Sequence, residues 1–200
     1  MEKKEQELNV YEQTMINCLK ETLGGEQKAF FYADESEENR IDILFAKGSP
    51  AKKYITASTL GLVNRATGYE EKETGKEIRA EIIMSGPMGT DLTGRILATL
   101  GKGIVDTNVR YGYGTVFKDI ISLYYPESEM KHVFLMLPPP KWQKEFKAVD
   151  CEGCLITFLY ALPISDEEMN YMDEKGINAL QDLFVEKNIN MFDPERKSVI

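Results

Sequence analysis

The sequence predicts a domain of mixed α and β structure. Helices are expected at its beginning, middle and end, and antiparallel strands are expected between the first helix and the second. Apolar residues recur at helical spacing in three stretches, and β-branched and aromatic runs bounded by turn residues lie between them. A length of 200 residues with 42% hydrophobic residues suits one compact domain with a sizeable core. Because no long linker rich in glycine, serine and proline divides the chain, we expect residues 1–200 to form a single domain.

The first helix is expected over residues 5–23. Its apolar positions at helical spacing are Leu8, Tyr11, Met15, Cys18 or Leu19, and Leu23. Gly24 and Gly25 end the helix, since glycine readily adopts the left-handed conformation at a helix terminus. Cys18 falls on or beside the apolar stripe, which favours a packed thiol over a reactive one.

Short strand-like runs follow this helix and are separated by turn clusters. The runs are residues 29–33, 41–46, 54–63 and 77–84, and an exposed polar loop is expected over residues 68–76. Short turns between successive strands favour an antiparallel meander.

The second helix is expected to begin at Thr90 or Asp91, because either side chain can accept hydrogen bonds from the first turn. Its apolar stripe consists of Leu92, Ile96, Leu97, Leu100 and Ile104, although Gly94 and Gly101 weaken it. Later strands are expected at residues 118–125, 132–137 and 154–162, and Pro138–Pro140 ends the second of these. The third is almost continuously apolar, which predicts a central position in a sheet.

The C-terminal region begins with a sharp helix signal. Ser165 and Glu168 have the spacing of a capping box, and Ile164 and Met169 have that of a hydrophobic staple. Gly176 ends this short helix, and a second helix is expected to turn Ile177, Leu180, Leu183 and Phe184 toward the core. The polar tail, residues 192–198, is expected to be an exposed end.

The charge balance is acidic, with 33 Asp and Glu against 24 Lys and Arg and a formal net charge of −9. This balance argues against direct nucleic-acid binding and against binding to an anionic membrane surface. Acidic runs occur at residues 34–38, 70–73 and 166–168. The first two are interpreted as solvated surface or as a docking surface for a basic partner, and helix capping explains the third.

The N-terminus carries charges without a following apolar stretch, so it does not read as a signal peptide. No apolar run approaches the roughly 20 residues that span a bilayer. We therefore expect a cytoplasmic protein.

The cysteines Cys151 and Cys154 have CxxC spacing, which suits redox chemistry, half of a zinc site or a structural role. A zinc site needs further ligands, yet the chain has three cysteines and one histidine, His132. A redox pair usually precedes a helix, whereas this pair leads into a strand-like run. The structural interpretation is favoured, and a redox role stays open.

No residue is assigned to catalysis, to a cofactor or to a metal. His132 lies at the start of an expected strand without a GxSxG motif. The glycine pairs Gly101/Gly103 and Gly112/Gly114 lack the later glycine of a dinucleotide fingerprint, and Ser85–Thr90 reads as a turn before a helix. Trp142 is expected to pack a loop against the body, with an exposed anchor as the alternative.

The C-terminal third resembles the suppressor-of-fused domain family. The resemblance rests on Pro126–Met130, the strand ending at Leu137–Pro138, the run Ile156–Pro163 leading into Ile164–Glu168, and Gly176 before Ala179–Phe184. It implies an α+β fold with a central mixed or antiparallel sheet flanked by helices. The resemblance also implies a protein that works by binding. The quoted motifs encode a strand-to-helix junction and no active site.

Bacterial members of this family look like immunity proteins or antitoxins encoded beside toxins, some of which are nucleases. The resemblance therefore implies a non-catalytic protein whose partner is a cognate toxin, with unknown contact residues and oligomeric state. The alternative is a small hydrolase or ligand-binding enzyme with an unrecognised carboxylate site, which a deep pocket with two facing carboxylates would support. A third hypothesis is a structural or regulatory adaptor.

Overall fold

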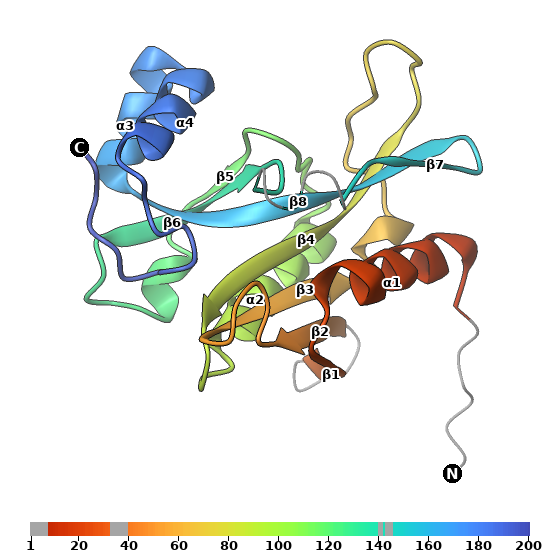
Figure 1. Ribbon diagram of the computed structural model, residues 1–200. Helices are drawn as coiled ribbons and strands as arrows, with labels where there is room; N and C mark the ends of the chain where they lie inside the picture. The colour runs from red at the N-terminus through yellow and green to blue at the C-terminus, as the bar shows by residue number, and fades with distance from the viewer. Residues whose placement is uncertain (1–7, 33–39, 140–141, 143–145) are drawn as a thin grey trace.

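The computed structural model of the protein describes residues 8–32, 40–139, 142 and 146–200, which form one eight-stranded sheet with helices on both faces (Figure 1). The strands are β1 Glu26–Tyr32, β2 Ile41–Lys47, β3 Tyr54–Leu60, β4 Ile78–Pro87, β5 Val116–Phe117, β6 Met130–Met136, β7 Val149–Cys151 and β8 Cys154–Ser165. The helices are α1 Val10–Leu23, α2 Leu92–Thr107, α3 Asp166–Lys175 and α4 Ile177–Glu186, with short 3-10 turns η1 Leu62–Asn64 and η2 Ile121–Leu123.

The strands lie in the order β1-β2-β3-β4-β8-β6-β5, and β7 pairs with β8 outside this path. Successive strands β1 to β4 are antiparallel, which confirms the predicted meander. β4 and β8 are parallel, with Ile78 beside Leu155, whereas β6 is antiparallel to β8. The sheet is therefore mixed and flanked by helices, as the α+β prediction required, and β8 takes the predicted central position.

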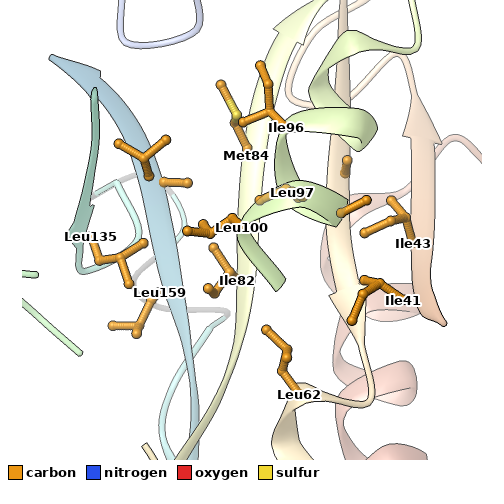
Figure 2. Packing of buried hydrophobic residues seen from close by; sticks show 14 of the residues in the cluster. Ile41, Ile43, Leu62, Ile82, Met84, Ile96, Leu97, Leu100, Leu135 and Leu159 are labelled. Atoms are coloured by element: carbon orange, nitrogen blue, oxygen red, sulfur yellow. The ribbon is translucent and has the colours of Figure 1, made fainter. Parts of the chain in front are cut away.

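One face of the sheet is covered by α2. In Figure 2 the apolar side chains of α2 lie between those of β4 and those of β2. The cluster includes Ile41, Ile43, Ile82, Met84, Ile96, Leu97, Leu100, Leu135 and Leu159. Gly94 explains the close approach of α2, because a Cβ atom there would lie 2.0 Å from the Phe45 ring. The glycine that weakens the isolated helix is thus required by its packing.

The opposite face is covered by α1, α3, α4 and the C-terminal tail. Alternate side chains of β8 point into this layer, and they are Ile156, Phe158, Tyr160, Leu162 and Ile164. Trp142 packs here at 7% exposure, with its ring centroid 5.7 Å from that of Phe146. The predicted role of Trp142 in packing is therefore confirmed.

Two expected strands differ from the structure. Residues 118–125 do not form a strand: β5 ends at Phe117, Asp119 adopts φ 60°, and η2 buries Ile121. The expected strand 54–63 ends at Leu60, because Gly61 adopts φ 101° and starts η1. In both places a positive φ turns the chain out of the extended conformation, so an apolar run packs without lying in the sheet.

The N-termini of α1 and α2 differ in detail from the expected ones. α1 begins after Asn9, whose side chain accepts from the Glu12 N–H in a capping box, and residues 5–7 of the expected helix lie outside the described residues. Asp91 occupies the N-cap of α2 without capping it, since it pairs with Arg95, and Thr90 accepts from the Leu92 N–H at 3.4 Å.

The expected strands differ from the structure at two further places. The first half of Ser85–Thr90 extends β4, where Pro87 lies beside Tyr54, so the turn is shorter than expected. The two-stranded ladder of β7 with β8 was missing from the expected elements.

The C-terminal tail is anchored, which contradicts the expectation of an exposed end. Arg196 is 8% exposed and forms two hydrogen bonds with the buried Glu168 carboxylate, at 2.6 and 2.7 Å. Arg196 also donates to the Pro163 carbonyl at 2.9 Å. The predicted capping box of Ser165 and Glu168 is confirmed. One carboxylate therefore caps α3 and holds the tail.

A second buried carboxylate, Glu81, lies within β4 and holds the end of β3. It accepts hydrogen bonds from the Thr59 hydroxyl at 2.6 Å and from the N–H groups of Gly61 and Val63 at 2.7 and 3.1 Å. Burial raises the pKa of Glu81 to about 7, although these hydrogen bonds favour the charged form and limit the rise.

Replacing Glu168 with alanine should strongly destabilise the protein, because Arg196 would remain buried without its partner. We expect Glu168→Ala to lower the free energy of unfolding by about 3–5 kcal/mol, measured by urea denaturation. Glu167→Ala, at an exposed neighbouring position, is the matched control and should cost much less. A loss of less than about 1 kcal/mol for Glu168→Ala would contradict this role.

The buried Glu81 should make stability depend on pH. Its folded pKa of about 7 lies above the ordinary 4.5, so the folded state binds the proton more tightly. The resulting stabilisation is complete below pH 4.5 and is lost as pH rises through 7, by roughly 3 kcal/mol at most. The unfolding free energy of the wild type relative to Glu81→Gln should therefore fall between pH 5 and pH 8. Glu174→Gln, an exposed control, should leave the slope unchanged.

Candidate functional site

His132 is buried and bridges two elements. Its Nδ1 accepts from the Asp119 N–H at 3.0 Å, so Nε2 carries the proton and donates to the Asp166 carboxylate at 2.9 Å. Both ring nitrogens are thereby occupied, one by a backbone N–H and the other by a carboxylate. This geometry gives His132 a structural role, joining the turn after β5 to the first turn of α3.

The CxxC motif is a tight hairpin between β7 and β8. Cys151 lies opposite Cys154, and the two residues between them, Glu152 and Gly153, have φ values of 47° and 84°. Positive φ at both positions is typical of the type I′ turn that joins antiparallel strands. The spacing therefore has a structural explanation, and the three cysteines, which all lie in the described residues, form no disulfide.

Cys154 contacts polar groups at the hairpin's base. Its sulfur lies 3.7 Å from the Tyr11 hydroxyl and 3.9 Å from Glu77 Oε1, and the Tyr11 contact is the largest cause of a raised Tyr11 pKa. The Arg79 guanidinium lies 5.0 Å above the Tyr11 ring. These contacts join α1 to β4 and β8.

Carboxylates line one small cavity of about 70 Å³, beside α1. They are Glu12, Asp42 and Glu81, and each has its own partner: Glu12 accepts from Asn64, Asp42 pairs with Arg40, and Glu81 holds the end of β3. The cavity is small compared with ligand sites of about 300–1,000 Å³. Within the described ranges, no group of three metal-ligating side chains is found. The hydrolase alternative gains no support from this cluster.

An apolar groove of about 370 Å³ lies between α4 and the end of β6. We call it the α4 groove; it is lined by Tyr113, Met136, Leu137, Leu162, Gln181, Phe184, Val185, Asn188, Ile189 and Met191. Three of these side chains are unusually exposed for their type: Val185 at 78%, Leu137 at 48% and Tyr113 at 44%. Tyr113 donates to Gln181 at 3.3 Å, which fixes the aromatic ring at the groove's rim.

α4, which lines this groove, and α3, which packs against α4, are acidic. Their exposed carboxylates are Asp166, Glu167, Asp173, Glu174, Asp182 and Glu186, against the exposed cations Lys175 and Lys187. An apolar groove flanked by an acidic surface suits a partner that offers an apolar side chain within a basic surface.

A second groove, of about 490 Å³, runs along β1 at the other margin of the sheet. We call it the β1 groove; it is lined by Glu26, Lys28, Phe30, Tyr32, Phe45, Lys47, Ile55 and residues 88–91. Its two carboxylates each have a cation beside them, Glu26 with Lys28 and Asp91 with Arg95. Lys28 is also the largest cause of the lowered pKa of Glu26.

The sequence did not identify either groove. Tyr113, Leu137 and Val185 are far apart in the chain, and no local pattern distinguishes an exposed apolar residue from a buried one. Of the acidic runs, residues 34–38 lie outside the described residues. Glu71 accepts from the N–H groups of Glu73 and Thr74, hydrogen bonds that lower its pKa, so this run shapes its own loop. In the part of the chain that is described, no helix is both long and apolar enough to cross a membrane.

The chain is similar in sequence to known proteins. Residues 37–197 match the family model described as Suppressor of fused protein (SUFU). The chain is 32% identical over 195 residues to Immunity protein YqcF of Bacillus subtilis strain 168, and the match covers 98% of both chains.

Solved structures share the fold at lower identity. A putative SUFU homologue from Neisseria gonorrhoeae FA 1090 has a TM-score of 0.73 and 18% identity, with 95% of this chain and 97% of that chain covered. A chain of the Sufu–Fu complex has a TM-score of 0.63 and 11% identity, with 94% and 92% covered. Drosophila Suppressor of Fused has a TM-score of 0.53 and 10% identity, with 92% of this chain and 45% of that chain covered. Given the family match and the relative that aligns along almost its whole length, the chain belongs to the suppressor of fused family.

Proposed function

We propose that this chain is a non-catalytic immunity protein that acts in the cytoplasm and neutralises a cognate toxin by binding it. The observation that carries this proposal is the 32% identity, along 98% of both chains, to a relative named as an immunity protein. The arrangement around His132 and the small carboxylate cavity offer no assembled catalytic site within the described residues. Binding in place of catalysis is consistent with the structural neighbour that belongs to the crystal structure of the Sufu–Fu complex.

The α4 groove is the surface that we assign to the toxin. Val185 is 78% exposed on α4, and Leu137 and Tyr113 flank it from the β6 side. Exposed apolar side chains that gather on one surface mark sites of protein interaction. The groove therefore supplies the apolar contact at the centre of the proposed interface.

Charge complementarity defines the kind of partner. The carboxylates of α3 and α4 outnumber the lysines on the same helices, and the whole chain has a formal net charge of −9. A nuclease toxin carries a basic surface to bind phosphate groups, and that surface would be attracted to these helices. Occupying the basic surface blocks the substrate, so neutralisation would be stoichiometric.

Coexpression with the candidate toxin encoded beside the gene tests the proposal. We expect a one-to-one complex on size-exclusion chromatography and rescue of growth. Val185→Lys places a positive charge in the apolar groove, where it removes an apolar contact and repels the basic surface of the toxin. We therefore expect it to weaken binding by at least about tenfold. Affinity can be measured by calorimetry.

The matched control is Leu123→Lys, which makes the same change at a position that is 66% exposed outside both grooves. It should bind like the wild type. Absence of both a complex and rescue would count against the immunity function, whereas a tight complex that is indifferent to Val185→Lys would refute only the assigned surface.

A further inference from the structure

β1 is the last strand at one margin of the described sheet. Among the described strands it pairs with β2 alone, so no described strand pairs with its outer side. The pairing with β2 runs without a bulge from Glu26 beside Lys47 to Tyr32 beside Ile41. β1 contains no proline, and its single lysine is held by Glu26 at 2.7 Å. Two of the usual devices that protect an edge from a second strand, a bulge and a proline, are thus missing from β1.

The same strand exposes two phenylalanines on opposite faces. Phe30 and Phe31 are each 53% exposed, although Phe30 touches the Phe45 ring and the Arg40 guanidinium lies 4.6 Å above the Phe31 ring. α2 packs on β2, β3 and β4, and Figure 1 shows β1 at the margin of the sheet beyond it. A strand edge that no described strand covers, with aromatic side chains that are about half exposed, favours the addition of another strand.

The sequence of β1 is complementary to itself when two copies run antiparallel with Ala29 on the two-fold axis. On the face of the β1 groove, Lys28 then lies opposite Phe30 of the second copy, and Glu26 lies opposite Tyr32. These are cation–π and carboxylate–hydroxyl pairs, and both occur twice by symmetry. On the other face, Gln27 lies opposite Phe31.

Other symmetric registers are poorer. Centring the axis on Lys28 brings two lysines face to face, which is unfavourable. Centring it on Gln27 or Phe30 pairs fewer of the seven residues between Glu26 and Tyr32. Only the register centred on Ala29 uses the whole strand without opposing like charges.

We propose that two copies of this chain associate through their β1 edges in this register, forming one continuous sheet across the dimer. The α4 groove lies near β6, at the other margin of the sheet, so the α4 groove of each copy stays open in this dimer. This dimer does not depend on the proposed immunity function, and each copy keeps one α4 groove at the margin of the sheet remote from β1.

Sedimentation equilibrium over a range of micromolar concentrations tests the dimer. The wild type should show a concentration-dependent approach to twice the monomer mass. Ala29→Lys places two lysines against each other on the axis and should weaken the dimer by at least about tenfold. Leu123→Lys, with the same charge change at an exposed position outside β1 and outside the lining of the β1 groove, should dimerise like the wild type. An unchanged circular dichroism spectrum and melting temperature would show that the Ala29→Lys variant is folded.

Cysteine cross-linking tests the register. Oxidised Ala29→Cys should yield a covalent dimer that reductant dissolves, whereas wild-type protein with its three native cysteines should not. Lys28→Cys should also fail to cross-link, because position 28 faces position 30 of the other copy.

Two results would overturn the proposal. One is a wild-type protein that stays monomeric at the highest concentration. If Ala29→Lys also abolishes toxin binding in that case, the β1 edge is assigned to the toxin instead. The other is a dimer that keeps its mass in Ala29→Lys and does not cross-link through Ala29→Cys.

Discussion

Burial of β8 on both faces is the constraint on which the rest of the structure depends. Leu159 and Ala161 belong to the cluster under α2, whereas Phe158, Tyr160 and Leu162 belong to the cluster under α1, α3 and α4. A strand that is apolar on both faces requires a layer on each side and a hydrogen-bonded neighbour along each edge. β4 and β6 supply the edges, and the strand leads directly into the capping box of α3, beside the α4 groove.

Buried polar side chains determine where the chain leaves the sheet. Glu81 and Glu168 each lie at a point where the chain leaves the sheet, Glu81 where β3 turns into η1 and Glu168 where β8 turns into α3. At each point, N–H groups lose their ladder partners and need acceptors, which a carboxylate provides. These residues thus fix where strands stop, and His132 does the same for the turn after β5.

The sequence predicted features that are encoded locally and missed those that depend on contacts between distant residues. The meander, the central place of β8 and the Ser165 capping box follow from alternation, apolarity and spacing within short segments. The Arg196–Glu168 pair joins positions 28 residues apart, and the α4 groove joins Tyr113, Leu137 and Val185, so no local pattern could reveal them. Residues 118–125 were misjudged because an apolar run indicates burial but does not distinguish a strand from a packed turn. Glu81 did leave a signal, as a lone carboxylate within an apolar strand.

The parallel pairing of β4 with β8 bears on how the chain acquires its structure. Ile78 lies beside Leu155, so this ladder closes across a long intervening segment, whereas β1 to β4 are joined by short connections. Loop-closure entropy delays contacts between distant segments, so the meander can assemble while the β8 side of β4 is still uncovered. Until β8 pairs with it, this edge of β4 is exposed to other chains. The rate at which β8 pairs with β4 therefore determines how long the folding chain can aggregate through this edge.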